Sequence, residues 1–160
     1  MLSYGCVACC VALIGVFAPL ALAAESKVVA PIRLNREAIA GVGIPAIPWV
    51  AKDRLGHELK LFESDEISVA VFESTPKDPR HSSHGVTDIR IDYPWDQFVM
   101  VLSGKAVLTD TAGHAQTFVA GDAFIVPRGF KGTWADYGVY RELIVIWGTA
   151  AKTREFKLND

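Results

Sequence analysis

The sequence contains no cysteine after Cys10 and no acidic or basic residue before Glu25. Because Cys6, Cys9 and Cys10 all lie in the first ten residues, residues 25–160 cannot form a disulfide of their own. The same absence excludes a cysteine nucleophile from that part of the chain. We therefore expect residues 25–160 to fold on a hydrophobic core alone.

The uncharged first segment has 20 hydrophobic residues among its 24 and ends in Ala21-Leu22-Ala23-Ala24. This ending, together with Pro19, predicts a secretory signal peptide over residues 1–24 that is cleaved near Ala23 or Ala24. The usual positively charged start is missing, so an uncut N-terminal membrane anchor over residues 6–24 is the alternative. We expect an exported protein, periplasmic or secreted, with no stable membrane association after cleavage.

A strong positive charge and several common catalytic motifs are also missing. The 16 basic and 18 acidic residues give a net charge of −2 and form no long blocks, so we expect no nucleic-acid partner. The sequence has no G-x-S-x-G motif, which excludes the usual serine hydrolase elbow. It also has no phosphate-binding glycine loop, because Gly41-Val42-Gly43 lacks a third glycine and a following helix.

From His57 onward the chain consists of short apolar runs separated by turn residues, which is typical of β-strands. The preceding residues 25–56 contain three prolines and allow only a short helical turn near residues 35–40. We predict an all-β antiparallel sandwich or barrel over residues 57–148, with residues 25–56 as an N-terminal arm and residues 149–160 as a tail. The nine candidate strands are Glu58–Phe62, Ile67–Phe72, Thr87–Tyr93, Gln97–Leu102, Lys105–Thr109, Gln116–Val119, Ala123–Val126, Lys131–Asp136 and Val139–Trp147.

Turn residues mark the breaks between these runs. Ser103-Gly104, residues 110–113 and Gly121-Asp122 each predict a tight turn between two strands. The longest break, residues 74–85, is rich in serine, proline and histidine and predicts a loop. Glycines are expected at such reversals because they adopt positive φ without strain.

Two segments together resemble the core motifs of the cupin superfamily. The first is residues 97–104, and the second is the G-x5-P-x-G pattern formed by Gly121, Pro127 and Gly129. The continuation Phe130-Lys131-Gly132-Thr133-Trp134 is most similar to the subgroup related to (S)-ureidoglycine aminohydrolase. The resemblance covers about residues 57–148 and implies a double-stranded β-helix, a jelly-roll-like barrel that agrees with the strand count.

The resemblance also implies where metal ligands would lie. Metal-binding cupins use two histidines and a glutamate from the first motif and a histidine from the second. In this sequence, Gln97 stands at the glutamate position and Gly132 at the position of the last histidine. The histidine pair corresponds either to Arg90 and Asp92 or to Ile91 and Tyr93. Since none of the histidine positions holds an imidazole, we predict no cofactor in the barrel. The alternative is a divalent metal ion held by a non-standard set of Gln97, Asp92, His81 and His84.

Five residues are candidates for binding a small molecule instead: Gln97, Trp134, Asp92, Arg90 and Tyr93. If Gln97 points inward, strand alternation also turns Val99 and Val101 inward. Trp134 shares the inward direction of Gly132, where it either fills the barrel or stacks on a ligand.

The segment around Pro94 is expected near the mouth of the barrel. Its aromatic and carboxylate side chains either bind a polar organic ligand or stabilise a bend between two strands. Arg90 and Asp92 are two residues apart on one face, so they are also candidates for an internal ion pair at the former metal position.

The sequence therefore predicts an exported single-domain cupin that binds a small molecule or has lost an ancestral activity. The alternative is a divalent-metal-dependent enzyme of the ureidoglycine aminohydrolase type, which the resemblance links to release of ammonia from ureidoglycine. The known enzymes of that type have two cupin domains, whereas this chain has room for one. A third possibility is a structural module that forms a homodimer. The residues leave open whether the protein is an enzyme.

Overall fold

The computed structural model describes residues 30–48, 53–78 and 86–148. It divides the chain into two units, residues 1–32 and 33–160, and the helix and strands that it describes all belong to the second unit. The predicted signal peptide, the alternative anchor, His81, His84, the side chain of Arg90 and the tail lie outside the described residues. Within the described part of the chain, no helix is long and apolar enough to cross a membrane.

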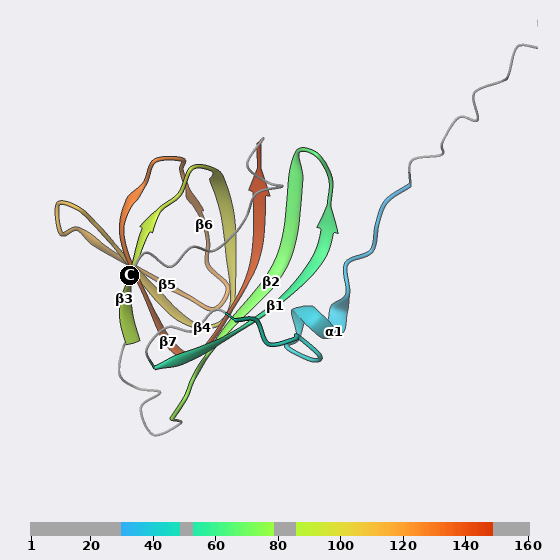
Figure 1. Cartoon of the computed structure of the whole chain (residues 1–160), viewed down its shortest axis with the longest axis horizontal. Coiled ribbons are helices and arrows are strands. Elements are labelled where there is room, and N and C mark those ends of the chain that lie inside the picture. Colours follow the sequence, from blue (N-terminus) through green and yellow to red (C-terminus); the bar gives the residue numbers. More distant parts are fainter. Residues whose placement is uncertain (1–29, 49–52, 79–85, 149–160) are drawn as a thin grey trace, which may run out of the picture. The chain divides into compact units, whose positions relative to one another are not determined.

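The all-β prediction is confirmed, because strands make up most of the described unit (Figure 1). Its elements are α1 (Arg36–Ile39), β1 (Arg54–Glu63), β2 (Ile67–Pro76), β3 (Val86–Asp92), β4 (Asp96–Asp110), β5 (Ala115–Val119), β6 (Ala123–Val126) and β7 (Lys131–Trp147). The helical turn expected near residues 35–40 is α1, where the Asn35 side chain accepts hydrogen bonds from the backbone of Glu37 and Ala38.

Two long strands, β4 and β7, hold the sheet together and give it two halves. In one half, the first part of β4 pairs with β6 and with the second part of β7, which continues to β2 and β1. In the other half, the second part of β4 pairs with β5 and with the first part of β7, which pairs with β3. The two halves curve around a common interior in Figure 1, as a double-stranded β-helix requires.

The nine candidate strands form seven, because the expected turn at Ser103-Gly104 and the gap between the last two candidate strands lie inside longer strands. Gly104 lies within β4 at a φ of 72°, and the β4–β7 register shifts on both sides of Ser103. Gly138 lies within β7 at a φ of 70°. A bulge bends a strand without ending it, so Ser103-Gly104 turns the chain from one half of the sheet to the other.

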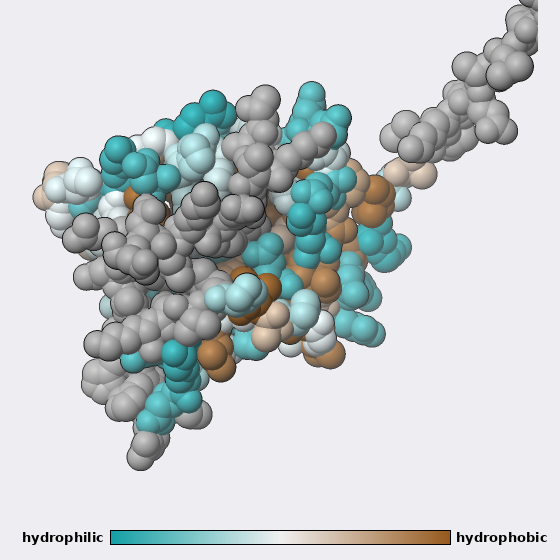
Figure 2. All heavy atoms as spheres, in the orientation of Figure 1, coloured by the Kyte–Doolittle hydropathy of each residue, from teal (hydrophilic) through white to brown (hydrophobic). Residues whose placement is uncertain are grey.

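Strand alternation places the core as expected. Gln97, Val99 and Val101 are 3%, 0% and 1% exposed, whereas Met100 between them is 38% exposed. The main hydrophobic cluster joins both halves of the sheet through Ile91, Val99, Val101, Ala106, Leu108, Val126, Trp134 and Tyr140. On the face drawn in Figure 2, hydrophobic residues form separate patches among hydrophilic ones.

Candidate functional site

The described residues at the positions implied for metal ligands do not form a metal site. Gln97 is buried, and its Oε1 accepts a hydrogen bond from Trp95 Nε1 at 3.3 Å. A Cβ atom at Gly132 would lie 2.1 Å from the carbonyl oxygen of Thr109, so no side chain, a histidine included, fits there. Among the described residues, no three His, Cys, Asp or Glu side chains lie together as a metal would require. The described residues at these positions therefore do not fit the metal that the fold implies.

Two of the possible histidine-pair positions, Ile91 in β3 and Tyr93 just after it, are also occupied by packed side chains. Ile91 is 5% exposed and belongs to the core. The Tyr93 ring stacks on Trp95 with 5.2 Å between the ring centroids. Of the two alternatives for the histidine pair, Ile91 and Tyr93 are the residues that pack against the core.

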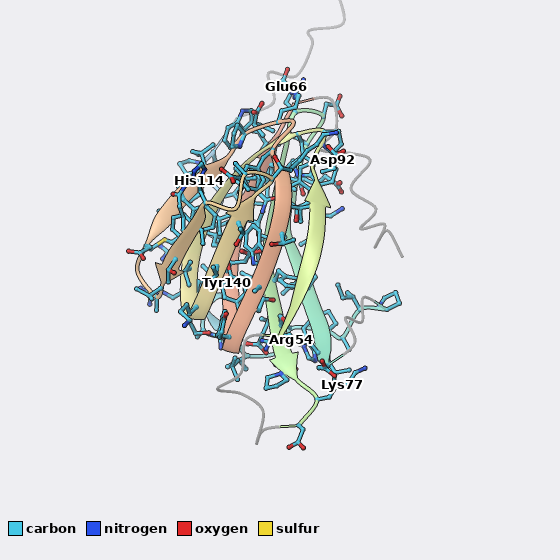
Figure 3. All side chains as sticks on the ribbon, turned by 90° about the vertical axis from the view of Figure 1, so that its left-hand side faces the viewer. Arg54, Glu66, Lys77, Asp92, His114 and Tyr140 are labelled. Carbon is cyan, nitrogen blue, oxygen red and sulfur yellow. The ribbon has the colours of Figure 1, made fainter. Side chains whose placement is uncertain are left out.

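Asp92 does not take part in an internal ion pair, contrary to the sequence-based hypothesis. It lies on the surface at the end of β3, where its Oδ2 is 3.0 Å from Lys131 Nζ and its side chain is 55% exposed (Figure 3). The physical reason is alternation, because Ile91 takes the inward direction and Asp92 must point outward. The side chain of its supposed partner Arg90 lies outside the described residues.

Trp134 fills the barrel interior. It is 5% exposed, and its Nε1 donates a hydrogen bond to Asp136 Oδ1 at 2.9 Å. Its ring lies edge-on to Tyr140, with centroids 6.3 Å apart, and tilted against Phe124, with centroids 5.8 Å apart. The packing alternative for Trp134 thus accounts for all of these contacts.

A buried polar cluster beside Trp134 was not expected. Arg54 is fully buried and donates from Nε to Ser74 Oγ at 2.5 Å and from Nη2 to the carbonyl oxygen of Gly138 at 2.6 Å. Its Nε lies 3.9 Å from Asp136 Oδ2. Burial raises the pKa of Asp136 to about 6, although Arg54 opposes the shift. Burial also lowers the pKa of Arg54.

A second buried pair lies further along β7. The Tyr140 hydroxyl donates a hydrogen bond to Glu142 Oε2, and both residues are less than 5% exposed. Burial, and then the charge of Glu142, raise the pKa of Tyr140 well above its usual range. The sequence carried a signal for these residues, because the alternation that turns Trp134 inward also turns Asp136, Tyr140 and Glu142 inward.

A cavity of about 240 Å³ opens between β5 and β6. One of its walls is formed by Phe118 and Phe124, whose rings stack with centroids 3.8 Å apart and an interplanar angle of 16°. The cavity is lined by Leu108, Asp110, His114, Gln116, Phe118, Phe124, Ile125, Val126, Pro127 and Phe130. Apolar side chains supply most of this lining, as in many small-molecule sites.

The polar part of the cavity comes from the turn between β4 and β5 (Figure 3, His114). His114 Nδ1 lies 3.0 Å from Asp110 Oδ2. Asp110 Oδ1 accepts hydrogen bonds from the backbone N–H groups of Ala112 and His114 at 2.8 and 2.9 Å. These backbone bonds, and then the His114 side chain, lower the pKa of Asp110, so the carboxylate is ionised at neutral pH.

Of the five residues predicted to bind a ligand, the four whose side chains the structure describes do not line this cavity. Trp134 comes nearest, since it packs behind the wall residue Phe124. A ligand-binding role for Gln97, Trp134, Asp92, Arg90 and Tyr93 stays a prediction. The cavity was missed because its wall forms only where side chains of β5 and β6, which pair with different parts of β4, come together.

Comparison with known proteins gives a family match and similar structures. Residues 83–136 match the model of the EutQ-like cupin domain family. The search of the curated proteins finds no match.

Three similar solved structures illustrate the likeness. The polyketide cyclase RemF from Streptomyces resistomycificus is 20% identical, with a TM-score of 0.52, over 74% of this chain and 80% of that chain. The EutQ protein of Clostridium difficile is 15% identical, with a TM-score of 0.49, over 60% of this chain and 70% of that chain. A cupin superfamily protein from Desulfitobacterium hafniense is 20% identical, with a TM-score of 0.48, over 62% and 83% of the two chains. At 20% identity, the likeness to RemF supports the fold alone.

Proposed function

We propose that this chain, whose residues 83–136 match the EutQ-like cupin domain family, binds a small molecule in the cavity between β5 and β6. The observation that carries the proposal is the cavity itself, which combines a stacked aromatic wall with a few polar groups at one side. Ligand sites in proteins commonly have this composition, because apolar walls supply affinity and a few polar groups fix orientation.

Trp134 supports this function from behind the cavity wall. Its contact with Phe124 fixes the position of that ring, and its hydrogen bond to Asp136 fixes its own. Tyr93 stacks on Trp95, and Gln97 accepts a hydrogen bond from it. Among the residues predicted to bind a ligand, Trp134 would thus act mainly by keeping the cavity wall rigid, whereas Asp92 lies on β3 and not in the lining.

The metal-dependent, ureidoglycine aminohydrolase-like alternative receives less support. Gly132 has no room for a ligand side chain, and Gln97 is already bonded to Trp95. Metal analysis of the refolded, chelator-stripped protein distinguishes the two functions. If the wild type bound one divalent ion per chain and Gln97→Ala lost it, the proposal of small-molecule binding without a metal would be wrong, and the metal-dependent alternative would be favoured.

A pair of tryptophan substitutions tests whether the cavity binds a ligand. Ile125 lines the cavity and is 52% exposed, so Ile125→Trp should fill the cavity while the strand is kept. Val119 is similarly exposed, at 48%, but does not line the cavity, which makes Val119→Trp the matched control. In a fragment screen of the full chain by NMR, we expect Ile125→Trp to weaken the hits at least about tenfold and Val119→Trp to leave them unchanged.

Two outcomes of this screen would count against the site. Hits that survive Ile125→Trp would place binding elsewhere, and equal losses in both variants would point to a general effect on the sheet. The melting temperature of each variant, measured alongside, separates loss of the cavity from loss of the fold.

A further inference from the structure

The two sides of the cavity differ in chemistry, and this difference indicates the class of ligand. Resting on the proposed function, we propose that the cavity takes a small planar aromatic compound with one hydrogen-bond donor, such as a phenolic hydroxyl, and that His114 accepts that hydrogen bond. The reasons lie in the aromatic wall, in the orientation of His114 and in the charge of the lining.

The apolar side of the cavity suits a flat ring. Phe118 and Phe124 stack face to face and nearly in parallel, so they can offer a ligand their ring edges and an outer ring face, and Phe130 adds a third ring to the lining. Aromatic rings pair favourably with such surfaces in offset or edge-on arrangements, beyond the gain from burying apolar area. Leu108 and Val126 close the inner end, because both belong to the buried core.

The polar side presents an oriented acceptor. The ionised Asp110 carboxylate can only accept, so the proton of a neutral His114 ring resides on Nδ1, which lies 3.0 Å from Asp110 Oδ2. The other ring nitrogen, Nε2, is then an acceptor. The His114 side chain is 80% exposed, and Gln116 adds an amide on the same side of the cavity.

The charge of the lining disfavours an anionic ligand. None of the described lining residues is Lys or Arg, and Asp110 adds a negative charge beside His114. An aromatic carboxylate would therefore meet like charge without a compensating cation. A neutral hydroxyl or ring N–H donor matches the acceptor and meets no such repulsion.

Titrations of the full chain with phenol, anisole and benzoate, followed by NMR and calorimetry, test this assignment. Phenol has the donor, anisole keeps the ring and oxygen but lacks the donor, and benzoate carries negative charge. We expect phenol to bind about tenfold more tightly than anisole, which corresponds to one hydrogen bond, and benzoate to bind more weakly than phenol.

Substitutions in the turn identify the acceptor. His114→Ala should weaken phenol about tenfold, to the level of anisole, and leave anisole unchanged. Thr111→Ala, an exposed change in the same turn but outside the lining, should leave both affinities as they are. His114→Gln, which retains an oxygen acceptor on a side chain of similar length, should restore part of the preference for phenol over anisole.

The outcomes separate this inference from the proposed function. If none of the three probes perturbs the lining residues and the wider screen gives no hits, the proposed function itself fails. If the probes bind the cavity with equal affinity, if benzoate binds best, or if His114→Ala leaves the preference for phenol intact, the cavity remains a binding site and the assigned ligand class is wrong.

Discussion

Asp136 keeps a carboxyl group at 1% exposure inside the barrel, with a buried arginine as its neighbour. The ion pair is loose, because Arg54 Nε lies 3.9 Å from the carboxylate and the guanidinium donates to Ser74 and Gly138 instead. The cost of burying the charge therefore exceeds the attraction, which is why the pKa of Asp136 rises to about 6.

This raised pKa predicts a pH dependence of stability. The carboxyl group binds its proton more tightly in the folded protein than in the unfolded chain, whose pKa is about 3.9. Its contribution to the free energy of unfolding is therefore complete below about pH 4 and is lost as the pH rises through about 6. The loss is about 3 kcal/mol, since one unit of pKa corresponds to about 1.4 kcal/mol.

Urea unfolding of the wild type and of Asp136→Asn between pH 4 and pH 7.5 measures this loss. The asparagine variant cannot ionise at this position, so the wild type should lose stability relative to it as the pH rises. If the free energy of unfolding changed with pH by the same amount in both proteins, Asp136 would not titrate in this range. Other carboxylates affect both proteins alike and cancel in the difference.

At the scale of elements, β4 and β7 bend through glycine bulges rather than ending at turns. A Cβ atom at Gly104 would lie 2.7 Å from the carbonyl oxygen of Tyr137 and 2.8 Å from that of Val139. Backbone atoms of β7 cannot move aside as a flexible side chain would. The bulge therefore needs glycine both for its positive φ and for the close approach of the two strands.

Gly104→Ala should consequently destabilise the domain by about 2 kcal/mol or more, from backbone strain together with the clash. Gly113→Ala is the matched control, because Gly113 has a φ of 88° but no atom within 4 Å of a built Cβ. It should cost only the left-handed strain, about 1 kcal/mol. Thermal and urea unfolding give both values, and equal losses would mean that the close approach contributes nothing.

At the scale of the whole molecule, we propose that residues 1–24 direct export and are then removed. The segment is uncharged and ends in small residues just before Glu25. Intact mass and N-terminal sequencing of protein recovered from the exported fraction should show a start at Ala24 or Glu25. A full-length protein retained in the membrane fraction would favour the anchor instead.

Cleavage would leave a chain without cysteine and without a nucleic-acid-binding charge pattern. Solution mass of this chain tests the proposed homodimer. A protein in which both halves of the sheet share one core is expected to unfold as a single unit.

Much of the fold followed from local pattern. The apolar runs located the strands, and alternation along β4 turned Gln97, Val99 and Val101 inward. Pattern failed at the bulges, because glycine with positive φ occurs both in turns and in bulges, and only strand pairing distinguishes them. It failed again at Asp92, where a shift of one residue exchanges the inside and the outside of the strand.

The candidate site was less predictable than the fold. Sequence alone determined that the barrel has no histidine at the implied metal positions and that Trp134 points inward. The tertiary structure alone decided that Gly132 is closed by Thr109, and that Phe118 and Phe124 meet to form a cavity wall. Residue types and alternation are properties of one strand, whereas a closed position or a cavity depends on how strands from different parts of the sheet meet.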